Sequence, residues 1–286
     1  SRDGLTIHGY ITYPPGNIRK NLPAVLFVHG GPWKRDNWGY NPAVQWIANR
    51  GYVCIQINYR GSTGYGKDFL NAGNKEWGGK MQEDLEDGVR WVIEKNIVDP
   101  ARIAIYGHGY GGFAALAGAT FTSDLFRCAI AVGCSGDLIT ILREIPEYRH
   151  CNRKQLLKQV GDPDTDREML ISRSPFYKLD NIKIPLLIAY GLKNYKIVSS
   201  EPYKIVSTLK SKGIDVEHVV FPDEGHKIIR KKNLIRFYAM AEKFLAKHLG
   251  GRYETEDIAT GEIDEDITGN THDDRSVIHK IVREGD

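Results

Sequence analysis

The sequence predicts an α/β protein whose sheet is mostly parallel and covered by helices on both faces. Apolar runs of strand length, such as Ala24–Val28 and Cys128–Val132, are continuous instead of alternating, which is typical of strands buried on both faces. Segments with the apolar spacing of an amphipathic helix, such as Met81–Glu94, separate these runs. Strands that alternate with helices in this way favour parallel pairing.

Strands and helices are expected in a regular order along the chain. The expected strands are Leu5–Tyr13 at an edge of the sheet, then Ala24–Val28, Tyr52–Asn58, Arg102–Tyr106, Cys128–Val132, Pro185–Tyr190 and Val216–Phe221. The expected helices are Pro42–Arg50, Met81–Glu94, Phe113–Thr120, Ser200–Lys212 and Asn233–His248. Residues 137–180 are polar, and we expect several short helices there without a strong strand.

Charge divides the chain into a body and a tail. Residues 251–286 include 11 acidic and 4 basic residues, a net charge of −7, which leaves +10 on residues 1–250 because the whole chain carries +3. We therefore predict a body over residues 1–249 and an acidic tail over residues 250–286 that is flexible or docked on the body. Scattered solvated lysines account for the positive charge of the body, so no nucleic-acid partner is expected.

Composition narrows the class of protein further. Apolar residues make up 41% and charged residues 26% of the chain, as in ordinary globular proteins. No apolar run approaches the roughly 18–20 residues of a membrane span, so no membrane partner is expected. No secretory signal opens the sequence, and the four cysteines show no Cys-x-x-Cys pairing. Buried thiols in a reducing compartment are the simplest interpretation, and we expect a cytoplasmic protein.

One segment of the tail has the beginning of a metal-binding pattern. Asp264–Gly269 starts like a calcium loop, but Arg275 stands where such a loop needs a bidentate Glu. We therefore expect no metal and no other cofactor. A homo-oligomer is left open.

A glycine-rich turn, Gly107–Gly112, lies between an expected strand and an Ala-rich helix. Two motifs share this shape. The nucleophile elbow, G-x-S-x-G, presents a serine at the edge of a sheet, and the dinucleotide fingerprint G-x-G-x-x-G is satisfied by Gly107, Gly109 and Gly112, with Asp137 as its acidic residue. Because that fingerprint belongs on the first strand of a sheet and other strands precede it here, the elbow is the preferred interpretation. A dinucleotide-binding protein stays an alternative.

Several spaced motifs together resemble one family. In chain order they are His29–Pro32, Asn58–Gly66, Trp77-Gly78 with Met81 and Asp84, the glycine-rich turn, and Asp223–His226. Over about residues 1–249 the chain resembles the prolyl oligopeptidase family, and within it the acylaminoacyl-peptidase group. The resemblance implies an α/β-hydrolase fold and a serine-type peptidase domain. In that family the domain usually follows a β-propeller that filters substrates, and no propeller is part of this sequence.

The resemblance also implies where the catalytic groups belong. The nucleophile position falls on Gly109, the acid position on Asn194 and the base on His226. The oxyanion donors would be the backbone N–H groups of Gly31 and Tyr110. A glycine has no side chain to attack a carbonyl, and Asn in place of the acid costs a triad roughly 10⁴ in rate.

We therefore interpret the chain as a peptidase-like domain that is catalytically inactive as it stands and acts by binding or scaffolding, with a peptide or small acylated ligand. The alternative is an altered or fragmentary copy of an active peptidase or esterase that hydrolyses short (acyl)peptides. Ser62, Ser135 and Cys134 are candidate substitute nucleophiles, although the sequence implies no adjacent base for them. His29 and His108 are expected to have structural roles.

Overall fold

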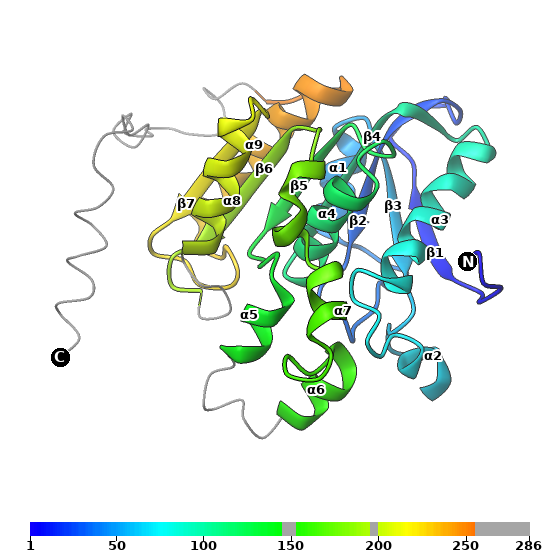
Figure 1. The fold of residues 1–286 in the computed structure, drawn as a ribbon. Coiled ribbons are helices and arrows are strands. Elements are labelled where there is room, and N and C mark those ends of the chain that lie inside the picture. Colours follow the sequence, from blue (N-terminus) through cyan, green and yellow to red (C-terminus); the bar gives the residue numbers. More distant parts are fainter. Residues whose placement is uncertain (145–152, 195–199, 255–286) are drawn as a thin grey trace. The chain divides into compact units, whose positions relative to one another are not determined.

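A seven-stranded sheet forms the centre of the structure, a computed structural model that describes residues 1–144, 153–194 and 200–254 (Figure 1). The strands are β1 (His8–Thr12), β2 (Leu22–Val28), β3 (Val53–Asn58), β4 (Val98–His108), β5 (Cys128–Val132), β6 (Leu186–Gly191) and β7 (Val216–Phe221). Their order in the sheet is β1-β3-β2-β4-β5-β6-β7. Only β1, at one edge, runs antiparallel to its neighbour among these strands. The predicted α/β class and the parallel sheet are confirmed.

Helices connect the parallel strands. They are α1 (Pro42–Asn49), α2 (Lys67–Asn71), α3 (Lys80–Glu94), α4 (Tyr110–Phe121), α5 (Leu138–Arg143), α6 (Arg153–Val160), α7 (Arg167–Ser172), the 3₁₀ segment η2 (Pro175–Asn181), α8 (Ser200–Ser211) and α9 (Lys231–Leu249). The region between β5 and β6 contains short helices, as the sequence predicts. The described part of the chain contains no helix with the length and apolar character of a membrane span.

Side chains of each strand alternate between two hydrophobic cores because successive residues of a strand point to opposite faces. Ala24 and Leu26 of β2 belong to the core that contains α3, α4 and α8, whereas Val25 between them belongs to the core that contains α1 and α9. The sheet is therefore covered on both faces. This explains why its strands read as continuous apolar runs.

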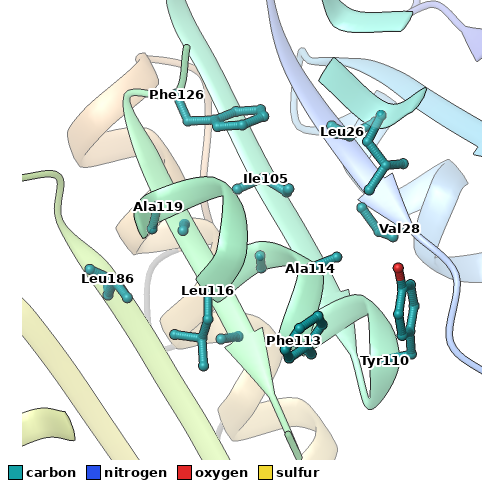
Figure 2. Close-up of a cluster of buried hydrophobic side chains, with 14 of the residues drawn as sticks. Leu26, Val28, Ile105, Tyr110, Phe113, Ala114, Leu116, Ala119, Phe126 and Leu186 are labelled. Atoms are coloured by element: carbon teal, nitrogen blue, oxygen red, sulfur yellow. The ribbon is translucent and has the colours of Figure 1, made fainter. Parts of the chain in front are cut away.

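Helix α4 lies in the middle of one of these cores. Every residue from Tyr110 to Thr120 is buried, and Figure 2 shows its side chains among those of β2, β4 and β6. The small residues of the helix permit this close approach: a Cβ added at Gly118 would lie 3.1 Å from the Ile105 side chain and 3.0 Å from the Phe126 ring. The N-terminus of α4 is thus held firmly at the carboxyl end of β4.

The predicted tail, residues 250–286, lies almost entirely outside the described residues, and so does the segment that resembles a calcium loop. Residues Ser1–Tyr253 form one structural unit. In that unit the carboxyl ends of β2 to β7 share one edge of the sheet, because these strands are parallel. All of the predicted site residues follow these carboxyl ends.

Candidate active site

Gly109 forms the turn between β4 and α4, with φ 63° and ψ −118°. Its N–H donates to the carbonyl of Val132 at 2.9 Å, and its own carbonyl accepts from the N–H of Phe113 at 3.0 Å. These two bonds fix the turn to β5 and to the first turn of α4. The positive φ is a conformation that residues with a Cβ adopt only at an energetic cost. A strained strand-to-helix turn of this kind defines a nucleophile elbow.

The other glycines of this turn are required by close backbone contacts. A Cβ at Gly107 would lie 2.3 Å from the carbonyl carbon of Gly111, and a Cβ at Gly111 would lie 2.1 Å from the carbonyl oxygen of Val28. Gly109 differs from them. Apart from its chain neighbours, a Cβ there would have only the His226 ring within 4 Å among the described residues, with Nε2 at 3.3 Å and Cε1 at 3.4 Å. A side chain at position 109 would therefore point at the imidazole of His226.

His226 lies on the turn that follows β7. The N–H of Glu224 closes this turn on the carbonyl of Phe221 at 3.2 Å, and the buried Glu224 carboxylate accepts from the Arg230 N–H at 2.8 Å and from the Asn233 amide at 2.9 Å. Burial alone would raise the pKa of Glu224, but the hydrogen bonds outweigh it and the pKa is lowered. Glu224 is therefore an ionised anchor for the turn.

His108 links this turn to the elbow. Its Nε2 lies 2.6 Å from the carbonyl oxygen of His226, and the two rings are 4.7 Å apart. Because a carbonyl only accepts hydrogen bonds, Nε2 of His108 is the donor. His108 has the structural role that the sequence predicts, but its contact with His226 was not predicted.

Asn194 lies on the turn after β6 and is 4% exposed. Two backbone bonds join this turn to the turn that carries His226: Leu192 N–H to Phe221 O at 3.1 Å and Lys193 N–H to Glu224 O at 2.9 Å. The structure therefore places the predicted acid and base positions on adjacent, hydrogen-bonded turns.

The predicted oxyanion donors also lie near the elbow. The turn after β2 packs against the turn after β4, since a Cβ added at Gly30 would lie 2.8 Å from the carbonyl oxygen of His108. Gly31 is the next residue and is exposed. Tyr110 is the first residue of α4, so its N–H has no acceptor within the helix. The Tyr110 N–H thus adjoins Gly109, and the turn that carries Gly31 packs against the elbow.

The three candidate substitute nucleophiles are poorly placed for attack. Ser62 is fully buried; its hydroxyl contacts the Tyr59 carbonyl at 2.7 Å and Nε2 of His29 at 3.1 Å. The expectation that it lacks an adjacent base is therefore wrong, but burial lowers the pKa of His29 to about 4 and excludes substrate from the pair. The Ser135 hydroxyl donates a hydrogen bond to the Glu201 carboxylate, with 2.5 Å between the two oxygens. Burial raises the pKa of the Cys134 thiol, which disfavours a thiolate.

Asp137, the acidic residue of the dinucleotide alternative, caps α5. Its carboxylate accepts from the Ile139 N–H at 2.9 Å, from the Thr140 hydroxyl at 2.7 Å and from the Tyr177 hydroxyl at 3.1 Å. These bonds give Asp137 a structural role. Among the residues that the structure describes, no group of three His, Cys, Asp or Glu side chains is arranged to hold a metal ion.

A surface hollow of about 670 Å³ is lined by Tyr13, Tyr40, Trp46 and Arg50, among others. It lies near α1 and contains none of the predicted site residues. The predicted nucleophile and base positions instead lie next to each other at the elbow.

The strand order and the elbow define an α/β-hydrolase fold. A family model described as the prolyl oligopeptidase family matches residues 38–252. The chain belongs to this family, as its motifs predict.

Comparison with individual relatives indicates the same family. The chain is 44% identical over 280 residues to dipeptidyl aminopeptidase BIII of Pseudoxanthomonas mexicana, covering 95% of this chain and 40% of the relative. It is 35% identical over 309 residues to dipeptidyl peptidase family member 6 of Caenorhabditis elegans, covering 100% and 40%. The acylamino-acid-releasing enzyme of Arabidopsis thaliana is 28% identical over 214 residues, covering 73% and 28%. The chain thus spans about two fifths or less of the length of these relatives.

Solved structures share the fold. An acylaminoacyl peptidase in complex with Z-Gly-Gly-Phe-chloromethyl ketone matches with a TM-score of 0.78 and 25% identity, covering 89% of this chain and 41% of that one. A puromycin-hydrolyzing peptidase of Mycobacterium tuberculosis matches with a TM-score of 0.80 and 26% identity, covering 86% and 38%.

Proposed function

We propose that this peptidase-family domain binds peptides or small acylated ligands at the site formed by Gly31, Gly109, Tyr110, Asn194 and His226, and that it does not turn them over. The observation that carries the proposal is the position of Gly109. A side chain there would face Nε2 of His226, and the chain has none. The group that would form an acyl-enzyme is missing at the one position from which the base could activate it.

The second replacement acts in the same direction. Asn194 itself supplies no carboxylate to fix the tautomer of the imidazole or to stabilise imidazolium, and an Asn at this position costs a triad roughly 10⁴ in rate. The backbone donors can still polarise a carbonyl, and such a remnant retains roughly 10³–10⁴ over water. Binding is therefore retained more fully than catalysis.

The relatives support the ligand class. Their names describe enzymes that act on dipeptidyl or acylamino-acid substrates, and one structural neighbour holds a peptide chloromethyl ketone. A peptide or a small acylated amino acid is therefore the ligand that we assign to this site. The buried thiols of Cys54 and Cys128 support the further proposal that the protein is cytoplasmic.

Restoring both groups tests the proposal. Turnover of dipeptidyl and N-acetyl-amino-acid chromogenic substrates is measured for the natural sequence, for Gly109→Ser and Asn194→Asp separately, and for the double variant. We expect no turnover by the natural sequence and a gain of at least about 10³-fold in the double variant. Turnover by the natural sequence that Gly109→Ser does not increase would contradict the assignment of the nucleophile position.

An altered copy of an active peptidase is the second candidate. The room at Gly109 and the retained His226 favour it, because they leave the catalytic framework in place. In this case the double variant would match an ordinary peptidase in rate. A double variant that gains turnover but stays far below that rate would instead favour the binding function, and a folded double variant without turnover would favour scaffolding.

A further inference from the structure

The missing side chain at Gly109 leaves room beside His226. Apart from the neighbours of Gly109 in the chain, the His226 ring supplies the only described atoms within 4 Å of a Cβ built there. Gly109 and His226 are both partly exposed, so a ligand can reach this room from solvent. It has the size of the missing side chain, and one ligand oxygen can fill it.

The turns around this room carry two backbone N–H donors and the aliphatic stem of a lysine. The N–H of Tyr110 lies at the N-terminus of α4, a 12-residue helix whose dipole favours negative charge there. The N–H of Gly31 lies on the adjoining turn, and the stem of Lys34 would approach within 3.1 Å of a Cβ at Gly31. The nearby carboxylate of Glu224 is occupied by Arg230 and Asn233.

We propose that the site selects peptides that end in a free carboxylate. One carboxylate oxygen takes the place of the substrate carbonyl at the N–H groups of Gly31 and Tyr110. The other occupies the room at Gly109 and accepts a hydrogen bond from Nε2 of His226. This inference rests on the proposed peptide-binding function and names its ligand class: a product-like acid instead of an uncleaved amide.

The chemistry separates an acid from an amide clearly. A carboxylate offers two acceptor oxygens, which match donors on both sides of Gly109. A C-terminal amide offers one acceptor and places an NH₂ group or a further residue toward His226. Charge-assisted hydrogen bonds are roughly twice as strong as neutral ones, so we expect the acid to bind about tenfold tighter or more.

The test compares two probes on the 286-residue chain by calorimetry: Z-Gly-Gly-Phe with a free carboxylate, and the same peptide as its C-terminal amide. The acid should bind at least about tenfold tighter. Gly109→Ser should reduce this preference to about threefold or less, because the hydroxyl fills the place of the second oxygen. Gly109→Ala tests the same blockage without a hydroxyl. Gly213→Ser, a matched substitution at positive φ in open space, should leave the preference unchanged.

The outcomes distinguish the two proposals. Equal binding of acid and amide by the natural sequence would overturn the carboxylate preference and leave peptide binding intact. A preference that both Gly109 variants retain would overturn the placement of the second oxygen. If neither probe binds the natural sequence or the Gly109→Ser, Asn194→Asp variant, the peptide-binding function itself is wrong. The comparison on the natural sequence decides the preference even if a Gly109 variant fails to fold.

Discussion

Replacing Gly109 with serine should lower the stability of the domain. The residue has φ 63° and ψ −118°, a conformation that glycine adopts freely and that a residue with a Cβ adopts only under strain. The new Cβ would also press on the His226 ring, at 3.3 Å from Nε2. Because this ring can shift by a few tenths of an ångström, backbone strain is the main cost.

Two opposing effects set the size of the change. Backbone strain of this kind costs about 1–3 kcal/mol for a residue other than glycine. Loss of glycine from the unfolded chain returns about 0.4–1 kcal/mol, because serine has fewer unfolded conformations to lose. We expect the free energy of unfolding to fall by about 1–2 kcal/mol. In a domain of this size the melting temperature should then fall by about 2–8 °C.

Thermal unfolding of the natural sequence, Gly109→Ser and Gly109→Ala measures this effect. Both variants should lose similar stability, because the Cβ causes the strain and the hydroxyl does not. Gly225→Ser serves as the control: a Cβ there makes only an ordinary contact, 3.6 Å from the Lys193 carbonyl oxygen, and its φ lies outside the left-handed region. If the melting temperatures of both Gly109 variants equal or exceed that of the unsubstituted chain, glycine does not relieve strain at the elbow.

Two further predictions concern buried charges. Asp84 is fully buried, and its carboxylate pairs with Arg60 at 2.7 Å. Asp84→Asn should therefore lower the free energy of unfolding, measured in urea, by about 3 kcal/mol. Asp3→Asn, on the exposed side of Arg60, is the control and should have a small effect. Burial raises the pKa of Glu201 to about 7 from its usual 4.5. The unfolded chain therefore releases this proton first, and stability should fall by at most about 3 kcal/mol as pH rises between these values. Glu201→Gln should flatten that dependence between pH 4.5 and pH 7, and an unchanged slope would show that another group causes it.

The buried strands could be predicted because they are apolar on both faces. Cys128–Val132 and Val216–Phe221 were predicted at the bounds that β5 and β7 have in the structure. The start of β4 was missed, since Pro100 suggests a break. Pairing of Leu22 with Val98 extends the strand past this proline, at a register shift in β2. Tertiary pairing here overrides the local signal.

The candidate site, like the fold, has features that the sequence predicts and features that it does not. The positions of Gly109, Asn194 and His226 follow from motif spacing, because each lies just after a parallel strand. The contact of His108 with the His226 carbonyl joins residues 118 positions apart in the chain. The contact of Glu201 with Ser135 depends on how α8 packs beside the turn after β5. Neither has a local sequence pattern, so only the folded arrangement reveals them.

The antiparallel direction of β1 has a practical consequence for handling this protein. His8 pairs with Asn58 at the carboxyl end of β3, so the N-terminal segment emerges on the edge of the sheet that carries the site. At the other end, the carbonyl of Gly250 accepts from the Tyr52 hydroxyl at 2.6 Å, beside the start of β3 at the opposite edge. A tag or surface linker joined to Ser1 would therefore leave the domain on the same edge of the sheet as the site. The described end of α9 at Gly250 lies on the opposite edge.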